Sequence, residues 1–367
     1  MRLLYVDPLG GEGGLGGYSD CLIRAYRDRG HQVTILTSVA AARAGFPPSW
    51  KTQTVYGAAF SRDRGQGRRA LAYLVGCVRT LPRVLTHDAL LHHLPHMAPI
   101  DAVTLWAARL AHCRVVLVAH DPRPLRHVPM ERWYRSYFRQ GDVVLVHGPA
   151  ARSDLLEYGV ESSRVRMVAH GDFLPRSVLS AAAAHASLGI TAPLRRPIAA
   201  IVGNLKPGKG IRRVVAAASA ANLGLGSLLV AGKPQNDNAL TAFLQHPQPL
   251  PLELKTVFGR LTVEQELAAY SLADVVLALY DSGYSSGVVA TAHALGKPVI
   301  LTDVGDLARQ AGPVDVVLSP DWTPAALAAA IGQVLESDET TPTFELGTSA
   351  MTPWQRHVDV VSEALER

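Results

Sequence analysis

The stretch that decides the fold is "RLLYVDPLGGEGGLGGYSD", residues 2–20. Its first six residues form an apolar run typical of a buried strand, and a glycine-rich loop follows. A helix is predicted from about Tyr18 to Arg29, ending at Gly30. A strand, a glycine loop and a helix in this order begin a parallel βα unit, whose loop lets backbone N–H groups approach an anion.

Apolar runs of similar length recur along the chain and predict the remaining strands. In the first half they lie at 32–38, 89–94, 114–120, 143–148 and 164–171. A small-residue stretch, 177–197, is interpreted as the connection between two domains. The pattern then restarts at 198–204, 226–232, 255–261, 274–279, 297–303 and 314–319. Apolar strands separated by helices predict an α/β chain with two Rossmann-like doubly wound domains, 1–180 and 181–351.

A further helix is predicted at the C-terminus, over 352–367. Thr352, Pro353 and Gln355 together form the start signal of a capping box. An apolar stripe follows at helical spacing, made of Trp354, Val358, Val361 and Leu365. A lone helix with such a stripe must pack against another part of the chain.

Composition is that of a globular enzyme, with 48% apolar and 18% charged residues. The three cysteines are too few for a disulfide framework, and neither a signal peptide nor a membrane-spanning run is evident, so we expect a cytoplasmic protein. Residues 1–180 carry 23 Lys and Arg against 14 Asp and Glu, whereas residues 181–367 carry 13 against 17. The basic half indicates either an anionic partner or ordinary solvated helix surfaces.

The glycine loop matches the pattern of a dinucleotide-binding loop, with glycines at positions 11, 13 and 16. That function also needs an acidic residue about 20 residues further on, at the end of the second strand, to bind a ribose. The second strand instead ends in "ILTSVAAA", residues 35–42, which contains no acid. The pattern therefore disfavours a nicotinamide or flavin site, and no cofactor is expected.

The second half offers an anion site of its own in "GNLKPGKG", residues 203–210. Lys206 and Lys209 lie in a turn between a strand and a helix that starts at about Gly210, where a diphosphate would need cations. The stretch lacks the Ser or Thr of a Walker A loop. The alternative is a solvated turn with ordinary surface lysines.

A second anion site is indicated by "LYDSGYSSGVVATAHALGKPVI", residues 279–300. A polar loop follows a strand and opens an apolar helix; its members are Asp281, Ser282, Gly283, Ser285, Ser286 and Gly287. The backbone N–H groups of Ser286, Gly287 and Val288 are expected to form an anion cradle. The alternative is a serine N-cap with nothing bound.

Histidines at strand ends are the remaining candidates. His120 and His170 lie where ligands bind in open α/β sheets, although a structural role is the commoner one for a lone histidine. The local group His87, His92, His93 and His96 has no zinc-motif spacing, and the chain has no Asp-x-Asp pair. No metal site is therefore expected.

Several of these stretches, in this order, resemble the retaining nucleotide-sugar glycosyltransferases of family 4, which have the two-domain GT-B fold. In the first domain the similar stretches are "YVDPLGGEGGLGGYSD", "RDRGHQVTILT", "VVLVAHDP", "DVVLVHGPAARSDLLEYGV" and "RVRMVAHGDF". In the second they are "VGNLKPGKGI", "FGRLTVEQELAAYSLADVVLALY" and "SGVVATAHALGKPVILTDVGDL". The resemblance covers nearly the whole length and implies two Rossmann-like domains facing a cleft, with the C-terminal helix crossing back to the first.

The resemblance also implies roles for individual residues. Gly14, Gly16 and Gly17 would face the donor diphosphate and sugar, and His120 would hydrogen-bond a hydroxyl of that sugar. Lys209 would bind the diphosphate, together with the amides of Ser286, Gly287 and Val288. The nucleobase would lie beside Gly259, Arg260 and Leu261.

Two departures from the family pattern stand out. Asn204 replaces the usual arginine, and Lys206 is the nearest cation that could supply its charge. Gly283 and Thr291 replace two glutamates that many members carry, a departure shared by a subgroup with Ser-Gly-Val in this loop. Asp281 or Ser282 would have to replace the glutamate contacts.

The resemblance implies a metal-independent, retaining hexosyltransferase that acts in polysaccharide, glycolipid or other glycoconjugate biosynthesis. Its partners would be a nucleoside diphosphate sugar and a saccharide, lipid-linked or small-molecule acceptor, with no nucleic acid. The segment 123–139, with five arginines and four aromatic residues, is either a contact to an anionic inner membrane face or an ordinary amphipathic helix. A non-catalytic nucleotide-sugar-binding protein is the alternative function, and a sugar-nucleotide epimerase or hydrolase is a third.

Overall fold

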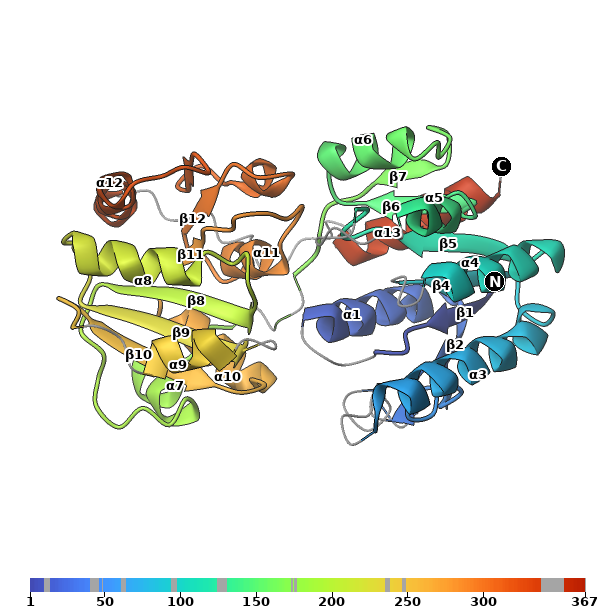
Figure 1. Cartoon of the computed structure of the whole chain (residues 1–367), viewed down its shortest axis with the longest axis horizontal. Helices are drawn as coiled ribbons and strands as arrows, with labels where there is room; N and C mark the ends of the chain where they lie inside the picture. The colour runs from blue at the N-terminus through green and yellow to red at the C-terminus, as the bar shows by residue number, and fades with distance from the viewer. Residues whose placement is uncertain are drawn as a thin grey trace. The chain divides into compact units, whose positions relative to one another are not determined.

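Two parallel sheets, each between layers of helices, make up the chain (Figure 1). The structure, a computed structural model, describes residues 1–9, 14–39, 46–47, 49–60, 64–93, 98–123, 131–172, 174, 177–234, 238–245, 249–337 and 353–366. Residue contacts divide the chain into two units. The first unit comprises Met1–Gly171 and Ala350–Arg367, and the second comprises Asp172–Ser349.

In the first unit the described strands form one sheet in the order β3-β2-β1-β4-β5-β6-β7. The strands are β1 (Arg2–Val6), β2 (Gln32–Leu36), β3 (Thr52–Gln53), β4 (Ala89–His92), β5 (Arg114–Val118), β6 (Val143–Val146) and β7 (Val165–Met167). The helices are α1 (Gly14–Asp28), α3 (Gln66–Val84), α4 (Ala98–Leu110), α5 (Glu131–Phe138), α6 (Pro149–Glu157) and α13 (Pro353–Leu365). The strands pair in parallel, as predicted from their continuous apolar runs.

The C-terminal helix α13 completes the core of the first unit, as expected from its apolar stripe. Trp354, Val358 and Val361 are buried in one cluster with Tyr18 and Leu22 of α1. The Arg29 guanidinium, just after α1, also donates to both carboxylate oxygens of Asp359 at 3.0 and 2.9 Å. Thr352, the expected N-cap, lies outside the described residues.

In the second unit the described strands form a sheet in the order β10-β9-β8-β11-β12-β13. The strands are β8 (Ile198–Leu205), β9 (Ser227–Pro234), β10 (Glu253–Phe258), β11 (Val275–Ala278), β12 (Val299–Thr302) and β13 (Val316–Leu318). The helices are α7 (Ala181–Ser187), α8 (Ile211–Ala220), α9 (Asn238–Gln245), α10 (Val263–Leu272), α11 (Gly287–Ala294) and α12 (Pro324–Glu336), with a 3-10 helix η1 (Leu307–Gln310).

Alternate residues of the β8 strand face two separate cores. Ala200 and Val202 pack with α7, α10 and α11, whereas Ala199 and Ile201 pack with α8, α9 and α12. The interpretation of 177–197 as the connection between domains is wrong, because the second unit begins at Asp172 and this stretch, which contains α7, lies wholly within it. Ala184 of α7 is fully buried in the first of these cores.

The strand predictions are otherwise confirmed, each within a few residues, and among the strands that the structure describes β3 alone was not predicted. The predicted start of the first helix is wrong: α1 begins at Gly14, not Tyr18, so Gly14, Gly16 and Gly17 belong to the helix and not to the loop before it. Residues 10–13 of that loop lie outside the described residues. Within the described part of the chain, no helix is long and apolar enough to span a bilayer.

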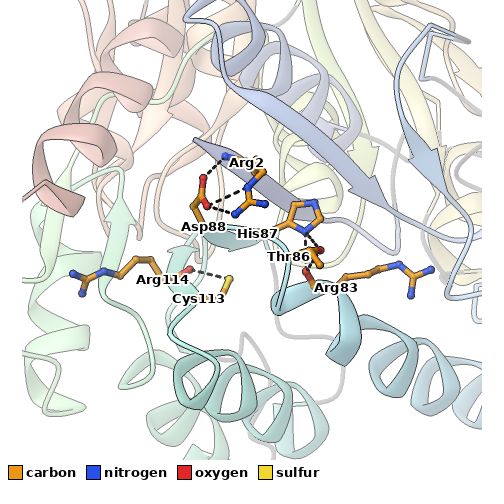
Figure 2. Close-up of polar contacts among 7 residues, drawn as sticks. All are labelled: Arg2, Arg83, Thr86, His87, Asp88, Cys113 and Arg114. Atoms are coloured by element: carbon orange, nitrogen blue, oxygen red, sulfur yellow. Dashed lines mark hydrogen bonds and ion pairs between the residues drawn. The ribbon is translucent and has the colours of Figure 1, made fainter.

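Polar contacts tie the strands together at the amino-terminal edge of the first sheet (Figure 2). Asp88, just before β4, accepts from the backbone N–H of Arg2 at 2.6 Å and from its guanidinium at 2.8 Å. His87 is at the same edge, where its Nδ1 donates to the carbonyl of Arg83 at 2.7 Å. Because β4 separates His87 from His92 and His93, these histidines do not form the local group that the sequence suggested.

Candidate functional site

The site candidates of the second unit gather where the strand order of its sheet reverses. The first strand, β8, pairs with β9 on one side and with β11 on the other. The loops that leave the carboxyl ends of β8 and β11 therefore start at neighbouring positions. Open α/β sheets bind their ligands at this switch point.

The turn after β8 depends on two glycines with positive φ. Gly208 has φ +87° and Gly210 has φ +66°. A side chain on Gly210 would also overlap the carbonyl oxygen of Leu279, the residue after β11. The backbone N–H of Asp281 donates to the carbonyl of Gly208 at 2.9 Å. The two loops are thus joined backbone to backbone.

The Lys209 side chain of this turn packs against the aromatic ring of Tyr280. The Nζ of Lys209 is 3.5 Å from the centre of the Tyr280 ring. The Tyr280 hydroxyl is 2.9 Å from Oγ of Ser286, and burial raises the pKa of Tyr280 to about 12, so the phenol is neutral at pH 7. Lys206 is the other lysine of the turn, and its charge acts on the same phenol.

The Ser286 backbone N–H does not take part in an anion cradle in this structure. It donates to Oε1 of Gln310 at 2.6 Å, and the Gln310 amide donates back to the Ser286 carbonyl at 3.1 Å. Ser286 is the N-cap residue of α11, but its side chain makes no capping hydrogen bond. Gly287 and Val288 are in the first turn of α11, where an α-helix supplies no backbone acceptor for the N–H groups.

A cavity of about 220 Å³ opens at the start of α8. Lys206, Gly208, Arg212 and Asp281 are among the residues that line it. The helix begins at Ile211 without a side-chain cap, and the dipole of α8 favours an anion at this end. Two cationic side chains and a helix N-terminus make the cavity suited to an anion.

The other predicted residues of the second unit lie at the ends of neighbouring strands. Asn204 is in β8 opposite Lys233 of β9, and Ser285 is half-buried before α11. Gly259, with φ +136°, donates its N–H to the carbonyl of Gly232 at 3.0 Å, and exposed Arg260 follows it. Leu261 packs against the core beside α10.

The two positions where related chains carry glutamates have distinct environments. Gly283 has φ +148°, a conformation that residues with a Cβ rarely adopt, and its carbonyl lies against Gly305. Thr291 is fully buried on α11. This loop backbone therefore does not accommodate a glutamate at 283 without rearrangement, and Ser282 lies close to the β8 turn, where a Cβ on Gly208 would be 3.5 Å from its Oγ.

In the first unit, His120 follows β5 and is part of a ring of histidines. Each of four strands is followed within three residues by a histidine: His93 after β4, His120 after β5, His147 after β6 and His170 after β7. The α1 residue Tyr18 lies in their midst, with ring centroids 4.6 Å from His120 and 5.3 Å from His170. Sequence reasoning missed His147, although its place after a buried strand was a usable signal.

Loss of hydration favours the neutral form of two of these imidazoles. The pKa of His120 and that of His147 are both lowered well below the ordinary value, mainly by loss of hydration and then by neighbouring histidines. His357 of α13 lies beside them, and burial lowers its pKa to about 4. The predicted single histidine is thus one of a cluster of histidines.

The arginine-rich segment 123–139 is described only in part, since residues 124–130 lie outside the described residues. In α5, Tyr137 and Phe138 are buried in the unit and Trp133 and Tyr134 are half-buried. Helix α5 is therefore an amphipathic helix with aromatic residues in the core of the unit.

Two sequence models of protein families match the chain. Glycosyltransferase Family 4 matches residues 12–171, and Glycosyl transferases group 1 matches residues 196–337. The two matches follow the division into two units and together cover most of the sequence. The chain belongs to the family 4 glycosyltransferases.

Solved structures resemble this glycosyltransferase over its whole length. Alr3699/HepE of Anabaena in complex with UDP-glucose has 15% identity and a TM-score of 0.70, covering 100% of this chain and 95% of its own. The sucrose-phosphate synthase of Thermosynechococcus elongatus has 18% identity and a TM-score of 0.72 at the same coverages, 100% and 95%. The catalytic domain of Arabidopsis thaliana starch synthase IV, bound to ADP and acarbose, has 11% identity and a TM-score of 0.71, covering 100% of both chains.

These likenesses show that this glycosyltransferase has the GT-B fold. No curated protein sequence matches the chain.

Proposed function

We propose that this glycosyltransferase transfers a hexose from a nucleoside diphosphate sugar to an acceptor hydroxyl, with retention of configuration and without a metal or cofactor. The observation that carries the proposal is the cavity at the start of α8, where Lys206 and the α8 backbone amides face one volume beside Asp281. A diphosphate has the charge and size for such a place. The HepE structure holds UDP-glucose and the starch synthase holds ADP, which supports a nucleotide donor.

Each candidate site residue has a role in binding the donor. Lys209, Lys206 and the first-turn amides of α8 and α11 bind the diphosphate, with Asn204, Ser285 and Ser282 beside them. Gly259, Arg260 and Leu261 border the nucleobase. In the first unit, His120 donates a hydrogen bond to a hydroxyl of the sugar, and the start of α1 at Gly14, Gly16 and Gly17 provides further amides.

The reaction breaks the bond between the anomeric carbon and the diphosphate oxygen. The acceptor oxygen forms its new bond on the same face, and the acceptor proton passes to the departing phosphate oxygen. Charge develops on the leaving diphosphate, so the lysines and amides stabilise the transition state more than the bound donor. The step needs no protein nucleophile, in contrast to hydrolases that use a pair of carboxylates.

The test is Lys209→Ala. Removing one donor that stabilises developing charge should lower kcat by roughly 100-fold. The protein should stay folded, with a loss of stability limited to that of the cation–π contact with Tyr280, about 0.5–2 kcal/mol. Lys255→Ala, a lysine of β10, is the matched control and should keep full activity. A fully active Lys209→Ala enzyme would rule out the diphosphate assignment.

Retention and metal independence are tested on the wild-type product. The anomeric configuration of the new linkage, read by NMR, should equal that of the donor. Activity should persist in excess EDTA. An inverted product or loss of transfer in EDTA contradicts the corresponding part of the proposal.

The acceptor we propose is lipid-linked, because α3 and α4 present an apolar surface. These two helices pack together, and each carries large exposed apolar side chains at helical spacing. On α3 and just after it they are Leu71, Leu74, Val75, Val78 and Leu85, and on α4 they are Val103, Trp106 and Leu110. Contiguous exposed apolar surface of this kind marks a contact to a protein or a membrane.

The charges around this α3/α4 surface favour an anionic membrane as the occupant. Helix α3 carries four arginines and no acidic residue, and its Arg68 and Arg79 are exposed. The one acid of α4, Asp101, is buried and accepts from the Tyr73 hydroxyl at 2.5 Å. Exposed arginines beside an apolar face, without carboxylates, match an anionic lipid surface.

Liposome flotation tests the membrane contact. The protein should float with anionic vesicles at physiological salt and not with zwitterionic ones. Trp106→Asp should abolish flotation, whereas Val263→Asp, at an equally exposed position of α10, should not change it. A wild-type protein that stays unbound would favour a soluble acceptor and leave the donor site untouched.

A non-catalytic nucleotide-sugar-binding protein is the alternative that the missing glutamates motivated. A thermal-shift panel of nucleoside diphosphate sugars followed by transfer assays separates the two, since a ligand of the folded state raises its melting temperature. Binding of a donor without hydrolysis or transfer would support the alternative. Turnover of the donor that binds supports the enzyme.

A further inference from the structure

Three histidines of the first unit bring ring nitrogens together, and the proposed transfer reaction gives a role to only one of them, His120. One ring nitrogen each of His120, His147 and His170 lies within 4.8 Å of the others. They come from the ends of β5, β6 and β7, which are adjacent strands of one parallel sheet. Their common position is therefore fixed by strand register and not by a flexible loop.

The tautomers of two of these rings follow from their hydrogen bonds. Nδ1 of His147 is 3.1 Å from the carbonyl oxygen of Val168, and Nδ1 of His170 is 2.8 Å from that of Gly171. A carbonyl oxygen can only accept, so each Nδ1 carries the proton and each Nε2 carries a lone pair. An Nδ1–H donated to a backbone carbonyl is the arrangement that orients histidine ligands of metals.

The Nε2 of His147 is the second observation that points to a ligand. It is buried and, among the described residues, has no hydrogen-bond partner. A buried polar nitrogen without a partner costs roughly 1–3 kcal/mol, a cost that coordination to a cation removes.

We infer that His120, His147 and His170 bind a divalent transition-metal ion, with Zn²⁺ as the best match. Three neutral imidazoles suit zinc, and a zinc ion with three histidines keeps a fourth position open. In a tetrahedral site the ligand nitrogens are about 3.3 Å apart, so side-chain rotations that bring them together by little more than an ångström complete the site.

The surroundings define what the fourth position accepts. Two further histidines lie beside the three: the ring centroid of His93 is 4.8 Å from that of His120, and that of His357 is 5.7 Å from that of His147. His93 approaches His120 with the two Nε2 atoms 3.2 Å apart, so one proton lies between them. Since neutral ligands leave the double positive charge of the ion uncompensated, the fourth ligand is an oxygen anion such as hydroxide or a phosphate oxygen.

The experiment uses untagged full-length protein and two metals. After removal of metals with a chelator, titration with Zn²⁺ should show one equivalent bound per chain and raise the melting temperature. Co²⁺ should give the visible absorption of a low-symmetry site. A folded wild-type protein that shows neither the Zn²⁺-dependent shift nor the Co²⁺ band would overturn the inference.

Variants assign the ligands. His147→Gln and His170→Gln should each weaken Zn²⁺ binding by more than the roughly 10- to 100-fold lost when a ligand only loses its hydrogen-bond partner. His87→Ala, at the opposite edge of the same sheet, is the control and should bind as the wild type does. Wild-type affinity in both glutamine variants would exclude this site.

These readouts are independent of sugar transfer. His120 has a role in sugar transfer as well as in the metal site, so the variants change His147 and His170 instead. A protein that transfers sugar and binds no zinc refutes only the metal site. One that binds zinc and transfers nothing refutes only the proposed function.

Discussion

The ammonium of Lys209 lies 3.5 Å from the centre of the Tyr280 ring, while the hydroxyl of the same ring is 2.9 Å from Ser286 of the next loop. One aromatic side chain thus holds the cation of the β8 turn and the start of α11 in a common arrangement. A lysine side chain has many rotamers, and the ring restricts them before any ligand arrives.

Replacing this ring should weaken donor binding. Tyr280→Leu removes the cation–π contact, worth about 0.5–2 kcal/mol, so the donor Kd should rise about 2- to 30-fold. Tyr280→Phe keeps the ring and should change the Kd far less. Calorimetric titration of both variants measures this. Equal affinities for the two would show that the ring does not position Lys209.

Gly210→Ala should destabilise the second unit strongly. An alanine at φ +66° costs roughly 1–2 kcal/mol, and its Cβ would also overlap the Leu279 carbonyl oxygen. Gly189→Ala is the matched control, with φ +65° and no atom within 4 Å of the added Cβ. Urea unfolding should show a larger loss of unfolding free energy for Gly210→Ala than for Gly189→Ala. Similar losses at both positions would mean that the loops move apart at little cost.

Stability of the first unit should fall in mild acid. His120, His147 and His357 have pKa values below that of an unfolded histidine, about 6.5, and that of His357 is about 4. Below pH 6.5 the unfolded chain binds protons that the folded chain does not. Each histidine should therefore remove up to about 1.4 kcal/mol of unfolding free energy per pH unit.

Urea unfolding in EDTA at pH 7, 6 and 5 measures this slope. The slope of unfolding free energy against pH should be smaller in His357→Gln, which has one fewer group to titrate. An unfolding free energy that stays constant from pH 7 to pH 5 would contradict the burial of neutral histidines.

Trp354→Ala should cost about 3–5 kcal/mol of unfolding free energy, because a large core side chain is lost. Trp354 is 7% exposed and its ring centroid is 4.7 Å from that of Tyr18. Trp106→Ala serves as the comparison, since Trp106 is 55% exposed and its loss should change stability by only about 0.5 kcal/mol. A mild effect at Trp354 would show that α13 is dispensable for the core.

The sheets could be predicted because their strands are buried on both faces, so the signal is a continuous apolar run. The two residues of β3, Thr52 and Gln53, carry no such signal. The stretch of α7 was interpreted as a connection because it is rich in small residues, although Ser180 caps it by accepting from the Ala183 N–H at 3.3 Å. The helix α1 starts within glycines of low helix propensity, where packing decides the outcome.

The candidate sites were predictable only where sequence neighbours act together. Lys206 and Lys209 share one turn, so their common position follows from spacing. The hydrogen bond between Ser286 and Gln310 joins residues 24 positions apart, and neither stretch of sequence contains a pattern that predicts it. The histidines are an intermediate case, because each follows a predicted strand but their convergence depends on the order of the strands in the sheet.

The place of α13 has a consequence for synthesis of the protein. Helix α13 is synthesised after the whole continuous segment Asp172–Ser349, yet it fills the core that residues 1–171 begin. The middle of the chain is therefore able to reach its native state while the beginning still waits for its final helix. During that interval the uncovered face around Tyr18 and Leu22 is open to chaperones, and a chain truncated before Trp354 would keep it open.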